Sequence, residues 1–362
     1  MSYLTALARA NPPFQFAQAD IAAFMVQAMQ LQEEAAEKLK ILFRASGIET
    51  RFSVVEDYGR TSSFTFFPNN QMLSPFPSTR QRMELYQQHA LGLSTRAASA
   101  CLEKASVRAN DITHLIVVSC TGQYAPGLDI DLVHQLQLPT TVARTSIQFM
   151  GCYAAFSALR LADAFCKANA QAKVLVVCTE LCSLHFQKEE TEDNVLANAL
   201  FADGSAALLV ESNPRSGISL NLNSFHCDLI PEASGEMAWR VGNYGFEMRL
   251  SAYVPQAIRG GIHRLMKQWT TNHGSFDFYA VHPGGKKILQ VIEDELGIDR
   301  SKNKHAHDVL RKFGNMSAPT ILFVLHEIMQ QLTPADQGKK ILGLGFGPGL
   351  TLESMVLSVY HS

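Results

Sequence analysis

The sequence predicts an α/β fold in which two related halves each contain a mixed sheet. Three observations lead to this prediction. Apolar strand-like runs alternate with helical segments, the order of elements in the first half returns in the second, and 362 residues that are 47% hydrophobic and 18% charged can bury a large core. We expect the halves to be residues 1–212 and 213–362.

In the first half, short apolar runs rich in β-branched residues predict strands that are buried on both faces. The expected strands are His114–Cys120, Lys173–Thr179 and Ala206–Val210, and Phe201–Ser205 is expected to be a turn. Apolar residues at helical spacing predict helices around these strands. The expected helices cover residues 18–43, 80–105 and 129–136, together with a long apolar helix at Cys152.

The second half repeats this order. The expected strands are Asp277–Val281, Ile341–Gly345 and Glu353–Tyr360, the expected helix is Lys286–Leu296, and Phe313–Leu322 opens another apolar helix. When the halves are compared, Gly151-Cys152 corresponds to Gly314-Asn315, because each pair starts a helix beyond a buried strand. Two related halves that face each other would direct Cys152, His282 and Asn315 at a common point.

Cys152 is a candidate nucleophile. Gly151 before it can adopt backbone angles that other residues resist. The thiol would then lie at the first turn of a helix, where the helix dipole favours the thiolate. On this local signal alone, the alternative is a small buried core residue, which describes most free cysteines.

Acyl transfer through a thioester needs a thiolate, a group that stabilises it by ion pairing, and donors for a developing oxyanion. Cys152, His282 and Asn315 would supply these three parts, and each is flanked by glycine or a glycine-rich turn. A histidine in an apolar segment is more often a satisfied core residue, but Pro283-Gly284-Gly285 marks a turn directly after the strand. Asn315 on its own is more simply explained as a helix cap.

Composition and spacing argue against several other classes of protein. A net charge of −2 does not favour nucleic-acid binding, and no apolar run reaches the ~18 residues of a membrane helix. Nothing at the start of the chain reads as a secretory signal. Seven cysteines without a Cys-x-x-Cys pair indicate reduced thiols in a cytoplasm, and the acidic residues show no metal-ligand spacing. Gly343–Gly349 is not followed by a helix that could receive a pyrophosphate, so a backbone that passes close to an active site fits it better than a dinucleotide loop.

Short motifs spread over essentially the whole chain are shared with one enzyme family. They are Asn11–Pro13, Gly151-Cys152, Val174–Cys178, Leu200–Gly204, Val281–Gly285, Gly314–Ser317 and Gly345–Thr351. On these motifs the chain resembles the type III polyketide synthases, the chalcone synthase-like family, and the pattern looks bacterial. The resemblance implies a thiolase fold in a layered αβαβα arrangement. The His-Pro-Gly-Gly and Gly-Phe-Gly-Pro-Gly motifs together separate this family from ketoacyl synthase III, its nearest relative.

The resemblance also implies chemical roles. Cys152 would take an acyl group from a coenzyme A thioester, and His282 would hold it as the thiolate. His282 and Asn315 would bind the thioester carbonyl of malonyl-CoA and stabilise the enolate left by decarboxylation, which attacks the Cys152 thioester in a Claisen condensation. Coenzyme A thioesters are then substrates and no metal or redox cofactor is required. A homodimer is implied, with its interface near the helix that follows Pro126-Gly127.

Further positions follow from the same resemblance. Phe201 matches one of two gatekeeper residues between the coenzyme tunnel and the cavity, with core packing as its alternative role. The second gatekeeper position is Met248, whose flexible thioether should make the gate more adaptable. The positions expected to line the substrate cavity are Cys120, Thr121, Ala125, Cys182, His185, Trp239 and Ser317, and Ala125 falls where a methionine of the partner subunit normally crosses the dimer. The candidates for the coenzyme A phosphates are Lys38, Arg44, Lys286 and Lys287, with Lys40 and Arg51 as further candidates.

The predicted function is therefore iterative condensation of malonyl-CoA on an acyl-CoA starter, followed by cyclisation to a pyrone or resorcinol-type product. Two alternatives stay open: a single-round ketoacyl synthase III-type enzyme, and a cysteine thioester hydrolase that uses water as the acceptor. The starter, the number of extensions and the cyclisation mode depend on cavity shape, which motifs do not resolve.

Overall fold

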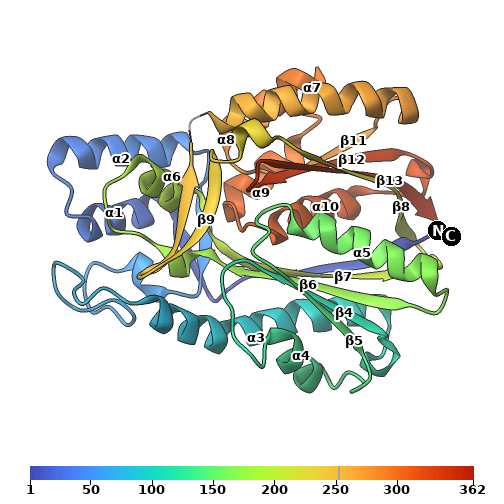
Figure 1. Cartoon of the computed structure of the whole chain (residues 1–362), viewed down its shortest axis with the longest axis horizontal. Coiled ribbons are helices and arrows are strands. Elements are labelled where there is room, and N and C mark those ends of the chain that lie inside the picture. Colours follow the sequence, from blue (N-terminus) through green and yellow to red (C-terminus); the bar gives the residue numbers. More distant parts are fainter. Residues whose placement is uncertain (252) are drawn as a thin grey trace.

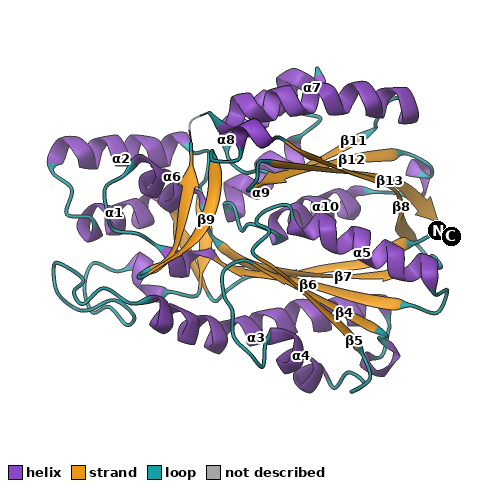
Figure 2. Ribbon diagram, in the orientation of Figure 1, coloured by secondary structure: helices purple, strands orange, loops and turns teal. Residues whose placement is uncertain are grey.

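The computed structural model describes residues 1–251 and 253–362, and it stacks helices and sheets in five layers (Figure 1). Helices α7 (Val254–His273) and α8 (Lys286–Leu296) cover one sheet, and α3 (Thr79–Ala105) and α4 (Leu128–Leu136) cover the other. Helices α5 (Ala154–Ala168) and α10 (Pro319–Gln331) fill the layer between the two sheets (Figure 2). The αβαβα arrangement that the resemblance implied is thus confirmed.

The strands of the two layers belong to one hydrogen-bonded sheet within the described residues. Its order is β11 (Phe278–Val281), β12 (Lys340–Gly347), β13 (Thr351–His361), β8 (Ile218–Leu229), β1 (Tyr3–Ala10), β7 (Asp203–Glu211), β6 (Lys173–Leu181), β4 (His114–Ser119) and β5 (Ala143–Gln148). Within this sheet the two layers are joined where β1 pairs with β8, through Tyr3 with Asn221 and Leu4 with Leu220.

The predicted duplication is visible in the strand directions. In the first half β4 pairs with β6 in parallel and β6 with β7 antiparallel, while in the second β11 pairs with β12 in parallel and β12 with β13 antiparallel. In each half the central helix, α5 or α10, follows the first of these strands. The sheet is mixed, as predicted.

Small side chains allow α5 to occupy the middle layer. Ala154, Ala155, Ala158 and Ala162 are at most 1% exposed and share one apolar core with strands of both layers and with α10. Because backbones can approach closely over alanine, α5 lies between the two sheets without leaving voids. This helix begins two residues after Cys152, so its packing fixes where the thiol lies.

Several predicted elements need correction. The single helix expected over residues 18–43 is two helices, α1 (Gln18–Ala28) and α2 (Glu33–Ala45). Gln30 adopts φ +55°, and Leu31 N–H donates to the Val26 carbonyl at 3.1 Å, which ends α1 as a left-handed residue usually does. The helix expected to open at Phe313–Leu322 is also divided, because α9 (Lys304–Phe313) ends there and α10 begins only at Pro319. The turn expected at Phe201–Ser205 is short, since β7 already starts at Asp203.

Elements missed from the sequence lie mostly on the side where α2 and α6 (Glu192–Leu200) pack (Figure 1). They include the short pair β2 (Phe14–Ala17) and β3 (Thr50–Ser53), and the hairpin β9 (Met237–Gly242) and β10 (Gly245–Leu250). Strands β1 and β8 at the centre of the sheet were missed as well.

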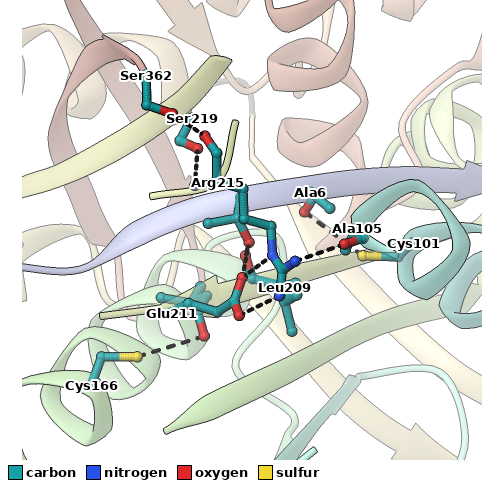
Figure 3. Close-up of polar contacts among 11 residues, drawn as sticks. Ala6, Cys101, Ala105, Cys166, Leu209, Glu211, Arg215, Ser219 and Ser362 are labelled. Carbon is teal, nitrogen blue, oxygen red and sulfur yellow. Dashed lines mark hydrogen bonds and ion pairs between the residues drawn. The ribbon is translucent and has the colours of Figure 1, made fainter. Parts of the chain in front are cut away.

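Arg215 lies in the connection between the two halves and holds it in place through hydrogen bonds (Figure 3). Its Nε and Nη2 donate to the Glu211 carboxylate at 2.6 and 2.7 Å, and its Nη1 donates to the Ala105 carbonyl at the end of α3 at 2.9 Å. Ser362 Oγ donates to the Arg215 carbonyl at 2.7 Å. One residue therefore links β7, α3 and the end of β13. In the described part of the chain, no helix has the length and apolar character needed to cross a bilayer.

Candidate active site

Cys152 lies in a buried chamber at the start of α5, reached by a turn that only glycine fits. Gly151 has φ +83°, and a Cβ there would stand 2.5 Å from Cδ of Pro348. On the same side, a Cβ at Gly347 would come within 3.4 Å of the Cys152 backbone nitrogen. The glycine run at residues 343–349 thus passes directly beside Cys152, as predicted.

His282 follows β11 and faces the same chamber. Its backbone N–H donates to the Leu344 carbonyl at 2.8 Å, and its ring contacts Phe346 with centroids 5.5 Å apart. The side chain is fully buried, and neither ring nitrogen has a hydrogen-bond partner among the described residues. Neither nitrogen is therefore committed to a bond within the described part of the chain.

Asn315 is held in one orientation by its neighbours. Its Oδ1 accepts from Ser317 N–H at 2.9 Å, and its Nδ2 donates to the Gly284 carbonyl at 3.3 Å. Because a backbone N–H can bond only to the amide oxygen, this contact determines which end of the amide is which. Cys152 Sγ lies 3.9 Å from Asn315 Oδ1. Asn315 is not a helix cap, since α10 begins four residues later with Ala318 as its N-cap.

The expected lowering of the thiol pKa is wrong for this structure. Burial raises the pKa of Cys152 to about 12, while hydrogen bonds to Ser317 and Asn315 lower it and the charge of Glu180 raises it. Burial likewise lowers the pKa of His282 to about 3. Desolvation has the largest effect on the Cys152 pKa, and Cys152 precedes even the N-cap of α5, so it does not lie in the first helical turn where the dipole was expected to act. Both groups are neutral at pH 7, and proton transfer from thiol to imidazole would create the thiolate and imidazolium together.

Three adjoining cavities surround these groups. The catalytic chamber, of about 40 Å³, is lined by Cys152, His282, Asn315 and their neighbours. The inner pocket, also about 40 Å³, lies towards α1 and shares Cys182, Phe201, Trp239 and Met248 with the chamber. The entrance pocket, of about 410 Å³, lies between α2, α6 and α8 and shares Leu250, Gly284 and Ile288 with the chamber.

Most of the predicted cavity residues lie on the chamber wall. These are Cys120, Thr121, Cys182, Trp239 and Ser317, and the two gatekeeper positions, Phe201 and Met248, line the chamber as well. His185 lies in the inner pocket instead, stacked on Phe246 and bonded through Nε2 to the Thr121 carbonyl at 2.7 Å. Ala125 does not line the chamber of its own chain, because it lies in a separate open pocket of about 670 Å³ beside β5.

The basic candidates separate into two groups. Lys286 and Lys287 line the entrance pocket at the N-terminus of α8, where the helix dipole also favours an anion. Lys38 pairs with Glu34 and Lys40 with Glu37, each at 2.7 Å, and neither lines that pocket. Arg44 is exposed on α2 and also lies off the pocket lining. Arg51 is buried and does not reach the entrance.

Glu180 is a buried carboxylate beside the chamber that the sequence interpretation missed. Its Oε2 accepts from Thr121 Oγ1 at 2.6 Å and from Cys120 N–H at 2.9 Å. Burial raises its pKa to about 7. An acidic residue inside the apolar strand that runs from Lys173 to Leu181 is the signal that could have revealed it.

Comparison with known proteins assigns the chain to a family. The models for the N-terminal and C-terminal domains of chalcone and stilbene synthases match residues 1–214 and 221–360. The chain is 31% identical over 343 residues to the α-pyrone synthesis polyketide synthase-like Pks18 of Mycobacterium tuberculosis, covering 91% of this chain and 87% of that protein. It is 32% identical over 337 residues to probable polyketide synthase 1 of Dictyostelium discoideum. That match covers 90% of this chain and 10% of the much longer Dictyostelium protein.

Solved structures of type III polyketide synthases have the same fold as this chain. The C-terminal type III polyketide synthase domain of Steely1, a type I/III hybrid from Dictyostelium, superposes with a TM-score of 0.88 at 28% identity, covering 99% of both chains. The polyketide synthase PKS-I from the brown alga Ectocarpus siliculosus superposes with a TM-score of 0.91 at 28% identity, covering 99% of this chain and 98% of that one. The chain belongs to the chalcone and stilbene synthase family. It is an acyltransferase-class enzyme of the type III polyketide synthases.

Proposed function

We propose that this enzyme condenses malonyl-CoA iteratively onto an acyl-CoA starter held as a thioester on Cys152, and then cyclises the chain. The observation that carries the proposal is that Cys152, His282 and Asn315 line one buried chamber, with the Asn315 amide locked by Ser317 and Gly284. A thiol, an unpartnered imidazole and an oriented amide donor are the groups that acyl transfer and enolate stabilisation need.

The first step loads the starter. His282 accepts the Cys152 thiol proton, and the thiolate attacks the thioester carbonyl of the acyl-CoA. The coenzyme A thiolate leaves and takes the proton back from His282, so the imidazole is neutral again. Because the dry chamber disfavours the thiolate and the imidazolium alike, both groups stay neutral between turnovers and the proton moves to His282 as the thiolate attacks.

The second step extends the chain. Asn315 Nδ2 and a ring N–H of His282 donate to the thioester carbonyl of malonyl-CoA, so that loss of carbon dioxide leaves a stabilised enolate. The enolate carbon attacks the Cys152 thioester carbonyl, and the carbon–sulfur bond to Cys152 breaks. The product is a β-ketoacyl-CoA, which can acylate Cys152 again for another round.

The entrance pocket is our proposed route for coenzyme A. Lys286 and Lys287 would bind its phosphates, while Lys38 and Arg44 would have a smaller role because they lie off the pocket lining. Phe201 and Met248 would act as gatekeepers, and Cys120, Thr121, Cys182, His185, Trp239 and Ser317 would shape the space for the chain. No prosthetic cofactor is needed for these steps.

We extend the proposal to product and assembly. The Mycobacterium relative is named for α-pyrone synthesis, which supports a pyrone or resorcinol-type product here. β5 is the last strand of the sheet, none of its residues is fully buried, and an unpaired edge needs a cover. A homodimer formed on this side, near Ala125 and α4, would provide one. We also propose a cytoplasmic location and a division of the chain at residues 212 and 213.

The test is mass spectrometry of products from purified enzyme with malonyl-CoA and starters of graded length. Triketide or tetraketide pyrones or resorcinols that are absent with Cys152→Ala would support the proposal. A single β-keto product would replace it with the single-round alternative. Free acid released without malonyl-CoA would indicate the hydrolase. In the same assay Asn315→Asp should slow malonyl-CoA decarboxylation by about 10²–10³-fold, while the starter still loads on Cys152.

A further inference from the structure

The inner pocket is lined by one charged side chain, and only part of its hydrogen-bonding capacity is used. Arg51 of β3 lines this pocket and is only 4% exposed. Its Nη1 donates to the Asn198 carbonyl at 2.8 Å and to the Phe201 carbonyl at 2.6 Å. Its Nε and Nη2 are buried and have no hydrogen-bond partner in the described part of the chain.

The two unused nitrogens form one edge of the guanidinium. The Nε–H and one Nη2–H point in the same direction, and this is the edge that a carboxylate approaches with two parallel hydrogen bonds. The Nη1 bonds orient the planar group and leave that edge free. Of the residues that line the inner pocket, Arg51 is the only one with buried polar atoms that lack a partner among the described residues.

The charge of Arg51 is not neutralised by a close ion pair. No carboxylate within the described residues lies within salt-bridge distance of it, and the Asp203 carboxylate accepts instead from Val54 N–H and from Ser183, at 2.6 to 2.8 Å. Burial lowers the pKa of Arg51 to about 10, while Tyr58 and the charge of Asp203 raise it, so the guanidinium is charged at pH 7 and Asp203 compensates it only from beyond ion-pair distance. A buried cation with two free donors is costly unless a ligand completes it.

We propose that the free edge of Arg51 binds the far end of the Cys152-bound chain, at a planar pair of oxygens that share one negative charge. This proposal rests on the proposed function and adds a specificity determinant to it. The inner pocket adjoins the catalytic chamber, since Cys182, Phe201, Trp239 and Met248 line both, and a chain attached to Cys152 would enter it past these side chains. The small volume of both cavities suits a short, oxygen-bearing chain end better than a long alkyl tail.

Two sources supply such a pair of oxygens. One is the carboxylate of a dicarboxylic starter. The other is the enolate of the 1,3-diketone that appears when a chain has been extended twice, formed when the carbon between the two carbonyls loses its proton to solvent. Both present two oxygens in one plane to the guanidinium edge, and neither needs an oxidant or a reductant.

The experiment measures loading and extension separately. Succinyl-, glutaryl- and adipyl-CoA are each paired with the acyl-CoA in which an isopropyl group replaces the carboxylate. Single-turnover acylation of Cys152 is followed by intact-protein mass spectrometry without malonyl-CoA. Wild-type enzyme is compared with Arg51→Lys, which keeps a cation and a donor for the Phe201 carbonyl but cannot form the bidentate edge.

If wild-type enzyme is acylated about ten- to hundredfold faster by the diacid starter than by its isopropyl counterpart, and this preference disappears in Arg51→Lys, Arg51 binds the carboxylate of a dicarboxylic starter. Equal loading of both starters, with a similar fall in the ratio of twice- to once-extended products in Arg51→Lys, assigns the diketone. If neither ratio changes, the proposal is overturned and Arg51 only supports the Phe201 backbone. Ile21→Phe narrows the same pocket from α1 without touching the guanidinium, and it replaces Arg51→Lys if that variant does not fold. The loading comparison does not require condensation, so it is decided even if the proposed function fails.

Discussion

The backbones of Phe201 and Asn315 form a parallel β-bridge between the two halves of the enzyme. Asn315 N–H donates to the Leu200 carbonyl and Ala202 N–H donates to the Asn315 carbonyl, both at 2.9 Å. The residue at the gatekeeper position and the residue with the amide donor are therefore held by one pair of hydrogen bonds. Since the bridge uses backbone atoms only, it does not depend on the Phe201 ring.

This bridge predicts that Phe201→Ala separates gating from chemistry. The variant should accept bulkier starters and shift product lengths, while malonyl-CoA decarboxylation stays close to wild type because Asn315 is not displaced. We expect a loss of about 1–2 kcal/mol in the free energy of unfolding, since the ring is only partly buried. Product mass spectra and a carbon dioxide release assay measure the two effects. A decarboxylation rate that falls together with starter selectivity would contradict the separation.

The entrance pocket predicts which charges bind coenzyme A. Reversing Lys286 or Lys287 to Glu should raise the KM for malonyl-CoA by roughly tenfold, because each reversal replaces attraction to a phosphate with repulsion. Higher salt should reduce the difference. Lys38→Glu is the matched control, since Lys38 is exposed and lies off the pocket lining. If Lys38→Glu raised the KM for malonyl-CoA as much as the substitutions at α8, the phosphates would bind at α2 instead.

Glu180 predicts a pH-dependent stability. Its pKa is raised from 4.5 to about 7, mainly by burial, so the folded state binds a proton that the unfolded state releases in this window. The contribution of neutral Glu180 to the free energy of unfolding is fully present below about pH 4.5 and is lost as the pH rises to about 7. Glu180→Gln cannot ionise, so its stability relative to wild type should increase between pH 5 and pH 8, by on the order of 3 kcal/mol at most.

Denaturant unfolding of both proteins at the two pH values measures this change. Any cost of burying the Gln amide is the same at both pH values, so it cancels when the stability difference from wild type at pH 8 is compared with that at pH 5. Glu190→Gln, at an exposed position, should show no such difference. If the relative stability of Glu180→Gln is the same at both pH values, Glu180 is ionised throughout.

The close packing of α5 in the middle layer predicts that larger side chains on its buried face destabilise the protein. Ala158→Leu adds a bulky side chain at a position with no exposed surface, between the two sheets, and should destabilise the protein by roughly 1–3 kcal/mol. Ala164→Leu on the exposed face of the same helix is the control and should change stability little. Thermal melting of both variants checks this. Equal melting temperatures would mean that α5 has space that the structure does not indicate.

The sequence predicted those parts of the fold whose residues carry a local signal. β4, β6 and α8 have continuous apolar runs or clear amphipathic spacing, and α8 begins and ends where expected. The break at Gln30 was missed because a left-handed glutamine follows from contacts made by the folded chain and not from residue type. β8 escaped notice because its second part alternates with exposed polar residues such as Asn223.

The same distinction applies to the site. Motifs that bracket Cys152, His282 and Asn315 located one chamber correctly, because strand ends and glycine turns fix where those side chains point. The protonation states could not be read from sequence, since they depend on how completely the fold removes water from Cys152 and His282. Arg51 illustrates the limit most clearly. As one basic residue among several it was a phosphate candidate, and only its burial under Phe201 shows that it faces inward.

The position of α5 between the two sheets has a consequence for biosynthesis. When the first half has left the ribosome, the face of α5 that meets β13 and α10 has no partner, and the β1 edge that pairs with β8 is unpaired. The nascent protein therefore presents an apolar alanine-rich surface until the last strands, β12 and β13, are synthesised. We therefore expect cooperative folding to wait for the end of translation, and the exposed apolar surface to be open to aggregation for longer than in a protein whose halves bury separate cores.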